Sequence, residues 1–205
     1  MDRYLENLND SQLRATLNTE GPMIVIAGAG SGKTRVLTYK IAYLMTKGID
    51  PFNILALTFT NKAAREMKDR IAMIVGDEAK NLWMGTFHSV FAKILRIEAE
   101  KLGYTSNFTI YDTEDSQKLV SSIIKELNLD KEIYKYKSIF ARISSLKNSL
   151  ITPKAYRQNV DLVESDKIAK RTSFIDIYVE YINRCFKAGA MDFDDLLLKT
   201  NELLS

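Results

Sequence analysis

The feature that most constrains this 205-residue chain is a glycine-rich stretch between an apolar run and an amphipathic run. Residues 22–28, PMIVIAG, are almost entirely apolar and end in glycine, which predicts a buried parallel strand. Residues 32–48, GKTRVLTYKIAYLMTKG, place apolar side chains at helical spacing, and Gly48 predicts the end of that helix. A strand, a glycine loop and a helix in this order predict a phosphate-binding loop on a parallel sheet.

The loop itself supplies the groups that a phosphate needs. Residues 27–34, AGAGSGKT, match the pattern G-x-x-x-x-G-K-[ST], except that alanine takes the place of the first glycine. Glycines let backbone N–H groups approach an anion, and the helix that follows contributes its positive end. Lys33 is predicted to contact the β- and γ-phosphates, and the Thr34 hydroxyl to bind Mg²⁺, so these two are the candidate catalytic residues. The predicted nucleotide contacts in the loop are Ala27, Gly28, Ala29, Gly30, Ser31, Gly32, Lys33 and Thr34.

Two other interpretations of the loop are weaker. A dinucleotide turn, G-x-G-x-x-G, would need glycine at position 33 if it began at Gly28, and lysine stands there. A glycine-rich turn that binds nothing would not require a strand before it and an amphipathic helix after it. A phosphate loop alone leaves the use of the nucleotide open, because many functional classes share it.

The chain changes character near residue 90. Before that point strands alternate with helices, which predicts crossover units and a parallel sheet. After it the strand signal nearly vanishes. In the first half we expect strands at 22–28, 53–59 and 82–87. We also expect a helix at 10–18 capped by Asp10, and a helix at 61–76 that is capped by Asn61 and ends at Gly76. In the second half we expect helices at 87–103, 113–129 with Asp112 as its cap, 138–149, 153–163 and 166–187, and a brief extended piece at 107–112.

Composition excludes several classes of protein. Hydrophobic residues make up 46% and charged residues 27%, which is ordinary for a soluble globular protein. Cys185 is the only cysteine, so no disulfide can form within the chain. No run approaches the roughly 18 apolar residues that a membrane span needs, and the polar start is not a secretory signal, so we expect a cytoplasmic protein with no membrane partner. The net charge of +3 permits a nucleic-acid partner but does not require one.

Four stretches, in order, resemble the UvrD/Rep-type helicases of superfamily 1. They are LNDSQ (8–12), AGAGSGKTRVL (27–37), LTFTNKAAREMKDRI (57–71) and GTFHS (85–89). A fifth, MDFDDLL (191–197), fits the place where this family returns from a helical insertion. The resemblance implies an α/β fold: an incomplete RecA-like P-loop NTPase parallel sheet with an all-helical inserted subdomain. Its parts would be the ATP-binding domain at 1–90, the insertion at 91–190 and the start of the return at 191–205.

The resemblance also implies a role for individual residues at the nucleotide. Gln12 corresponds to the glutamine that reads the edge of adenine, and an amide can donate and accept at once. Arg35 corresponds to the arginine that lies against the base. Taken from the residues alone, both could be solvated surface side chains. ATP and Mg²⁺ are the implied cofactors.

A second set of residues would hold single-stranded DNA. Ligands of open parallel sheets bind outside the carboxyl ends of the strands, where TFTNK and GTFH stand. Hydroxyls, an amide and a helix N-terminus suit phosphates, and an aromatic face suits a base. Phe59 could instead pack in the core, Arg65 could be a surface charge, and His88 could be a hydrogen-bonded structural histidine. The implied DNA contacts are Thr58, Phe59, Thr60, Asn61, Lys62, Arg65, Thr86 and His88.

Two further clusters have stronger structural interpretations than functional ones. Basic and aromatic side chains alternate in residues 131–148, which would suit a nucleic-acid backbone but is commoner on a solvated helix face. Asp192, Asp194 and Asp195 resemble a metal site, yet Asp192 as a helix cap with two acidic residues in the first turn explains them without a metal.

The sequence therefore predicts the N-terminal part of an ATP-dependent DNA helicase or translocase. By resemblance it would move 3′ to 5′, act on single strands and duplex junctions, and serve DNA repair or replication. The family's D-E-x-Q-D strand does not occur before Ser205, so we expect this chain by itself to be inactive. Three alternatives stay open: the helicase half of a helicase–nuclease, a P-loop switch or small-molecule kinase, and a non-catalytic DNA-binding fragment.

Overall fold

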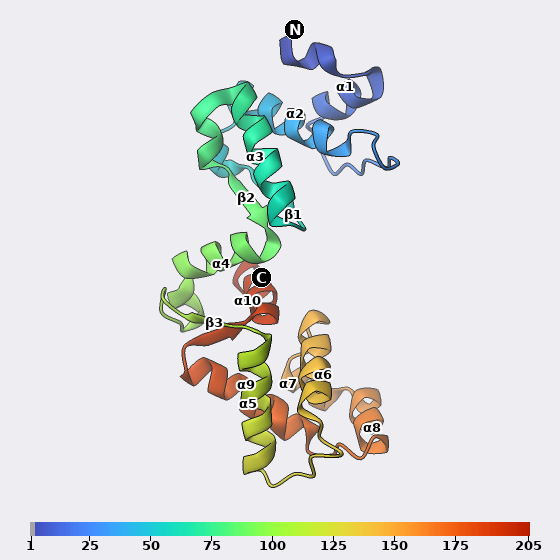
Figure 1. Ribbon diagram of the computed structural model, residues 1–205, viewed down its shortest axis with the longest axis vertical. Coiled ribbons are helices and arrows are strands. Elements are labelled where there is room, and N and C mark those ends of the chain that lie inside the picture. Colours follow the sequence, from blue (N-terminus) through green and yellow to red (C-terminus); the bar gives the residue numbers. More distant parts are fainter. Residues whose placement is uncertain (1–2) are drawn as a thin grey trace. The chain divides into compact units, whose positions relative to one another are not determined.

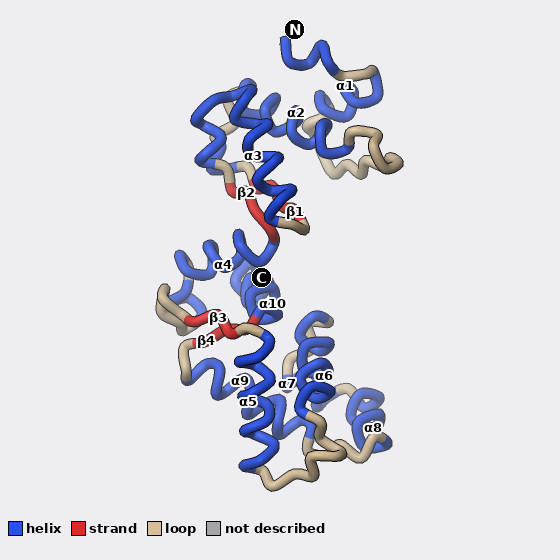
Figure 2. The backbone as a smooth tube through the Cα atoms, viewed as in Figure 1, coloured by secondary structure: helices blue, strands red, loops and turns tan. Residues whose placement is uncertain are grey.

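The computed structural model describes residues 3–205, which divide into an N-terminal unit ending at Val90 and a C-terminal unit, Phe91–Ser205 (Figure 1). Both units mix helices with a short parallel pair of strands (Figure 2). No helix among the described residues is long and apolar enough to cross a bilayer.

The N-terminal unit consists of helices around one pair of strands. Strands β1 (Leu55–Thr58) and β2 (Trp83–Thr86) are parallel, and Thr58 lies opposite Thr86 in the register. Ile41 and Met45 pack against Ala56, Met67 and Ile71 in its core. The remaining elements are η1 (Arg3–Asn7), α1 (Asp10–Leu17), α2 (Lys33–Thr46), η2 (Pro51–Asn53), α3 (Asn61–Val75), η3 (Gly76–Asn81) and the start of α4 (Phe87–Ile97).

The predicted strand at residues 22–28 is wrong. These residues have no regular secondary structure, and the side chains of Ile24 and Ile26 are 87% and 93% exposed. A strand is stable when a neighbouring strand pairs with its backbone groups. Within residues 3–205, β1 and β2 pair only with each other, so nothing pairs with the apolar segment that leads into the loop.

Other predictions for this unit hold with local corrections. Strand β1 forms, but it is only partly buried, because Leu55 is exposed. The caps lie one residue earlier than expected: Asn9 rather than Asp10 caps α1, and Thr60 rather than Asn61 caps α3. Helix α2 ends before Gly48, which has a φ of 85° and is therefore suited to the left-handed turn after a helix.

The C-terminal unit is mostly helical but not entirely so. Strand β3 (Thr109–Tyr111), in the region predicted to be extended, pairs in parallel with β4 (Ala190–Asp192). An aromatic core contains Phe174, Tyr178 and Tyr181. Helices cover the expected second-half regions, with two corrections. The helix expected at 87–103 is divided into α4 and η4, and three helices replace the two expected at 153–163 and 166–187. The helices of this unit are η4 (Ala99–Leu102), α5 (Thr113–Glu126), α6 (Tyr136–Asn148), α7 (Pro153–Gln158), α8 (Val160–Ile168), α9 (Phe174–Lys187) and α10 (Phe193–Leu204), together with the remainder of α4.

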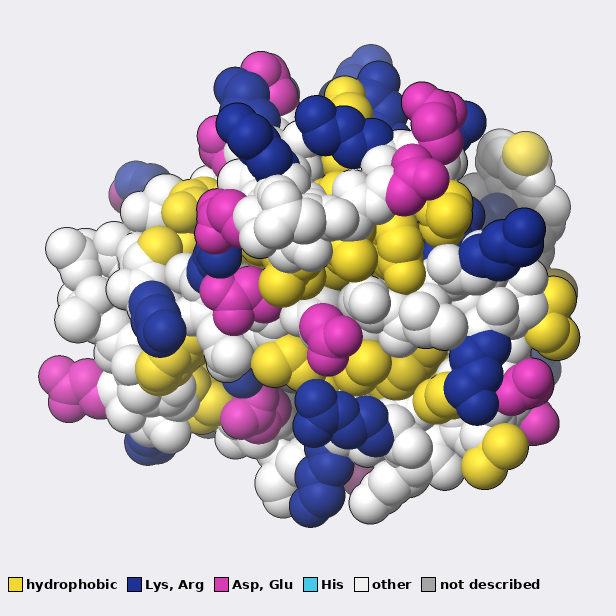
Figure 3. Space-filling view, turned by 90° about the horizontal axis from the view of Figure 1, so that it is seen from below, with side chains coloured by type: hydrophobic (Ala, Val, Ile, Leu, Met, Phe, Trp, Pro, Cys, Tyr) yellow, Lys and Arg dark blue, Asp and Glu magenta, His cyan; other side chains and the backbone are white. Residues whose placement is uncertain are grey.

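The charges on one face of the molecule are mixed. On the face shown in Figure 3, Lys and Arg side chains alternate with Asp and Glu side chains around bands of hydrophobic ones. Interspersed charges of both signs give this face no field of a single sign.

Candidate functional site

The glycine loop turns directly into helix α2. Gly32 is the N-cap of α2 and has a φ of 88°, a left-handed conformation that glycine adopts without a Cβ clash. The turn before it is closed by Ser31, whose hydroxyl donates to the carbonyl of Gly28 at 2.7 Å. The loop therefore places Lys33 at the first position of the helix and Thr34 at the second.

Lys33 lies back across its own loop. Its Nζ donates to the carbonyl oxygens of Ala27 and Gly28, each at 2.7 Å. Both bonds are made by an exposed ammonium group to backbone acceptors, with no carboxylate involved. The lysine is thus held over the loop by contacts that an incoming anion could replace.

A cavity of about 690 Å³ opens beside this loop. Its volume falls within the range of small-molecule sites, about 300–1,000 Å³. A Cβ added at Gly28 or Gly30 would meet no atom within 4 Å, so open space remains along the loop. The residues present fit a nucleotide with its Mg²⁺, since an ammonium, a hydroxyl and a helix N-terminus surround the space. Lining residues are Gln12, Gly30, Ser31, Gly32, Lys33, Thr34, Arg35, Thr38, Tyr39, Arg70, Met73 and Ile74.

The side chain of Gln12 contacts the glycine loop that follows it in the sequence. Its Nε2 donates to the carbonyl of Ser31 at 3.0 Å, and its Oε1 accepts from the backbone N–H of Asn9 at 3.2 Å. A side-chain amide has two donor hydrogens and two acceptor lone pairs, so one of each remains. The capping box between Asn9 and Gln12 therefore orients an amide that can still donate to and accept from a base.

Substituting Gly32 tests this packing. Gly32→Ala is expected to lower the free energy of unfolding by about 1–2 kcal/mol, because L-residues are strained at positive φ. The added Cβ would also lie 2.6 Å from Nε2 of Gln12. Urea unfolding followed by fluorescence of Trp83, the single tryptophan, reports on this unit. Gly28→Ala is the matched control, because Gly28 has ordinary φ and open space; an equal loss in both variants would contradict the assigned loop conformation.

The predicted DNA contacts gather at the carboxyl ends of β1 and β2. Phe59 follows β1 and is 92% exposed, so it does not pack in the core. Its ring centroid is 5.7 Å from that of Phe87, which follows β2 and was not predicted as a site residue. An exposed ring and a half-buried ring from two strand ends thus form one aromatic pair, and the parallel register explains why they meet.

The polar residues at this edge have different surroundings. Thr58 is buried, and its hydroxyl donates to the carbonyls of Thr60 and Gly85. The Thr60 hydroxyl accepts from the N–H of Ala63 as the cap of α3. Asn61, Lys62 and Arg65 are exposed on the first turns of α3. Thr86, at the end of β2, and His88, at the start of α4, are half-buried. The exposed group is free to meet a ligand, and Thr58 and Thr60 shape the turn that presents it.

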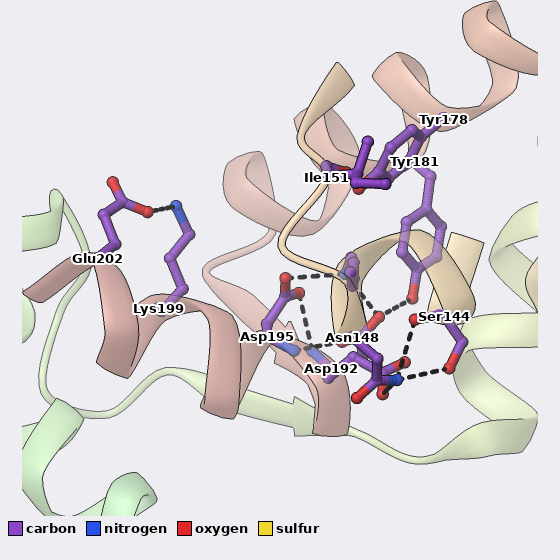
Figure 4. Close-up of polar contacts among 11 residues, drawn as sticks. Ser144, Asn148, Ile151, Tyr178, Tyr181, Asp192, Asp195, Lys199 and Glu202 are labelled. Atoms are coloured by element: carbon purple, nitrogen blue, oxygen red, sulfur yellow. Dashed lines mark hydrogen bonds and ion pairs between the residues drawn. The ribbon is translucent and has the colours of Figure 1, made fainter. Parts of the chain in front are cut away.

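The acidic cluster of the C-terminal unit surrounds a buried lysine. Asp192 caps α10, as predicted, with Asp195 completing a capping box. The Nζ of Lys147, from α6, lies 2.8 Å from a carboxylate oxygen of each of these aspartates. The hydroxyl of Tyr181 donates to Asp192 at 2.7 Å, and Asn148 donates to Asp194 (Figure 4). Among the described residues no group of three or more His, Cys, Asp or Glu side chains could hold a metal ion.

The cluster shifts the pKa values of Asp192, Asp195 and Lys147. Burial disfavours ionised Asp192, but the charge and hydrogen bond of Lys147 outweigh it, so the pKa of Asp192 is lowered. Burial raises the pKa of Asp195, which also faces the charge of Asp192. Burial opposes the charge on Lys147, yet the two carboxylates outweigh it and raise its pKa. Lys147 was predicted only as one of several basic residues, because nothing local in the sequence marks a partner 45 residues away.

Comparison with known proteins identifies the family. The family model described as the UvrD/REP helicase N-terminal domain matches residues 8–205. The ATP-dependent DNA helicase PcrA of Staphylococcus epidermidis is 42% identical over 204 residues, which is 99% of this chain and 27% of that protein. The protein of the same name from Staphylococcus aureus (strain COL) gives the same identity and coverage. The chain thus spans about a quarter of the length of these curated relatives. It belongs to the UvrD/REP helicase N-terminal domain family.

Proposed function

We propose that this chain is the nucleotide- and DNA-binding N-terminal part of an ATP-dependent DNA helicase. The observation that carries the proposal is the loop cavity, in which Gln12, the GKT residues and Arg35 line one space at the start of α2. The relatives named ATP-dependent DNA helicase support it, as does the family. A small-molecule kinase or switch would leave the exposed ring of Phe59 at the end of β1 without a role.

In this proposal one group of residues binds the phosphates and another group holds the adenine. Lys33 and the loop N–H groups would bind the β- and γ-phosphates of ATP, with Thr34 binding the Mg²⁺ that accompanies them. Gln12 and Arg35 would hold the adenine. ATP supplies the free energy of hydrolysis when a complete motor is assembled, and by itself this chain would bind without turning over.

We further propose that the fold is an incomplete RecA-like P-loop domain at residues 1–90, with a helical insertion at 91–190 and a return to that domain at 191–205. Closure of two motor domains on ATP and opening after hydrolysis would move single-stranded DNA along the strand ends, in the 3′ to 5′ direction. The partners would be single-stranded DNA and duplex junctions during repair or replication.

The DNA half of the proposal is tested at Phe59. Phe59→Ala is expected to weaken binding of a fluorescent oligo-thymidine strand by about 5- to 100-fold, since stacking of a base on an aromatic ring contributes about 1–3 kcal/mol. Fluorescence anisotropy at low salt measures the affinity.

The matched control is Phe52→Ala. Phe52 is also exposed but precedes β1 at its amino end, so it should leave the affinity unchanged. If the Phe59→Ala variant and the unmodified chain bind the oligo-thymidine strand with equal affinity, the carboxyl ends of the strands are not the DNA-binding edge. Equal losses of affinity in the Phe52→Ala and Phe59→Ala variants would show that exposed aromatic side chains contribute to DNA binding wherever they lie.

A further inference from the structure

Tyr39 lies beside Arg35 at the loop cavity. The two residues are one turn apart on α2, and both line the cavity. The Cζ of Arg35 is 6.0 Å from the centroid of the Tyr39 ring, within cation–π distance. Within the described chain, no carboxylate lies within ion-pair distance of Arg35. The Tyr39 ring is therefore the neighbouring group that the guanidinium of Arg35 contacts in the described chain.

The Tyr39 ring also contacts a residue of a second element. Tyr4, in η1, has its ring centroid 5.9 Å from that of Tyr39, at an interplanar angle of 53°. The hydroxyl of Tyr4 lies 3.2 Å from Oγ1 of Thr46, near the other end of α2. Tyr39 is half-buried, whereas Arg35 is exposed. A half-buried ring thus lies next to an exposed planar cation.

We propose that Tyr39 is a positioning residue for the nucleobase, holding the Arg35 guanidinium at the cavity so that its plane is available to a purine. A guanidinium stacks on aromatic faces, but its long stem must give up rotamer freedom when it does so. Because the Tyr39 ring already restricts the Arg35 side chain, less rotamer entropy is lost when the guanidinium stacks on a base. Met73 and Ile74 of α3 line the same cavity and offer it apolar surface. This inference rests on the proposed nucleotide function.

The test separates the base from the phosphates. A ribose-labelled fluorescent ATP analogue is bound to the 205-residue chain and displaced by ATP or by inorganic tripolyphosphate, up to millimolar concentrations. Tyr39→Leu keeps apolar bulk but removes the ring, so it should weaken ATP binding about two- to tenfold and leave tripolyphosphate binding unchanged. Tyr39→Phe should match the unmodified chain.

Tyr43→Leu is the matched control. Tyr43 lies one turn further along α2, is also half-buried, and has Nζ of Lys47 5.2 Å from its ring centroid, but it does not line the cavity. Tyr43→Leu should change neither the affinity for ATP nor the affinity for tripolyphosphate. In an Arg35→Ala background, Tyr39→Leu should cause no further loss, because the ring acts through the arginine.

Each other outcome overturns the inference. Unchanged ATP affinity in Tyr39→Leu, or an equal loss for ATP and tripolyphosphate, would show that the ring does not serve the base. A further loss in the Arg35→Ala background would show that Tyr39 acts independently of Arg35. If the unmodified chain binds neither ATP nor tripolyphosphate, the nucleotide function itself fails and this inference fails with it.

Discussion

Lys147→Met is expected to destabilise the C-terminal unit by about 3–5 kcal/mol, the largest stability change predicted for any single substitution in this chain. The side chain of Lys147 is fully buried, and its ammonium is shared between Asp192 and Asp195. Methionine has similar bulk but no charge, so both carboxylates would remain in the interior without a cation. Removing one partner of a buried ion pair costs far more than the pair itself contributes.

Circular dichroism during urea unfolding measures this effect as an earlier loss of the part of the helical signal that the C-terminal unit contributes. Trp83 fluorescence serves as an internal reference, since it reports on the other unit and should be unchanged. Lys118→Met is the matched control: Lys118 pairs with Glu114 at 2.7 Å on the exposed face of α5 and should cause little change. Similar midpoints for the two variants would contradict a buried role for Lys147.

Lys33→Ala is expected to lower ATP hydrolysis and duplex unwinding at least about 100-fold in the longer protein of which we propose this chain is a part. Lys33 is the only charged side chain in residues 27–34. Its loss leaves the backbone N–H groups and the helix N-terminus to face the phosphates alone. Charge that develops in phosphoryl transfer is stabilised mainly by such fixed cations.

Steady-state ATPase and strand-displacement assays measure both activities. Lys47→Ala is the matched control, because Lys47 follows the same helix at its other end and contacts Tyr43 instead of the loop. Unwinding at near the normal rate by the Lys33→Ala protein would show that this loop does not hold the transferred phosphate.

Structural features that depend on residues close together in the chain were predicted from local signals in the sequence. The helix after the loop, the stop at Gly76 and the caps at Asp112 and Asp192 depend on residues within one turn, and they were predicted correctly. Errors of one residue at Asn9 and Thr60 arose because neighbouring polar residues compete for the same cap.

Features that depend on distant segments were predicted poorly. The apolar run at 22–28 has the composition of a strand, but a strand needs a neighbour, and composition does not supply one. The pairing of β3 with β4 and the partners of Lys147 join residues far apart in the chain. At the candidate site, the loop and Gln12 were predicted from motifs. Tyr39 lies one turn from Arg35 on the same helix, but its contact with Tyr4 and the contact of Phe87 with Phe59 join segments that local signals do not connect.

The two bonds from Lys33 to its own loop have a consequence for turnover. Under the proposed function, an arriving phosphate would compete with the carbonyls of Ala27 and Gly28 for the same ammonium, so its net attraction would be reduced by the bonds that are given up. When the product left, the lysine would return to those carbonyls. The ammonium would exchange one set of acceptors for another in both directions, which would lower the barrier to release as well as the affinity. In a motor that must discharge its nucleotide at every step, such an internal competitor would favour rapid cycling over tight retention.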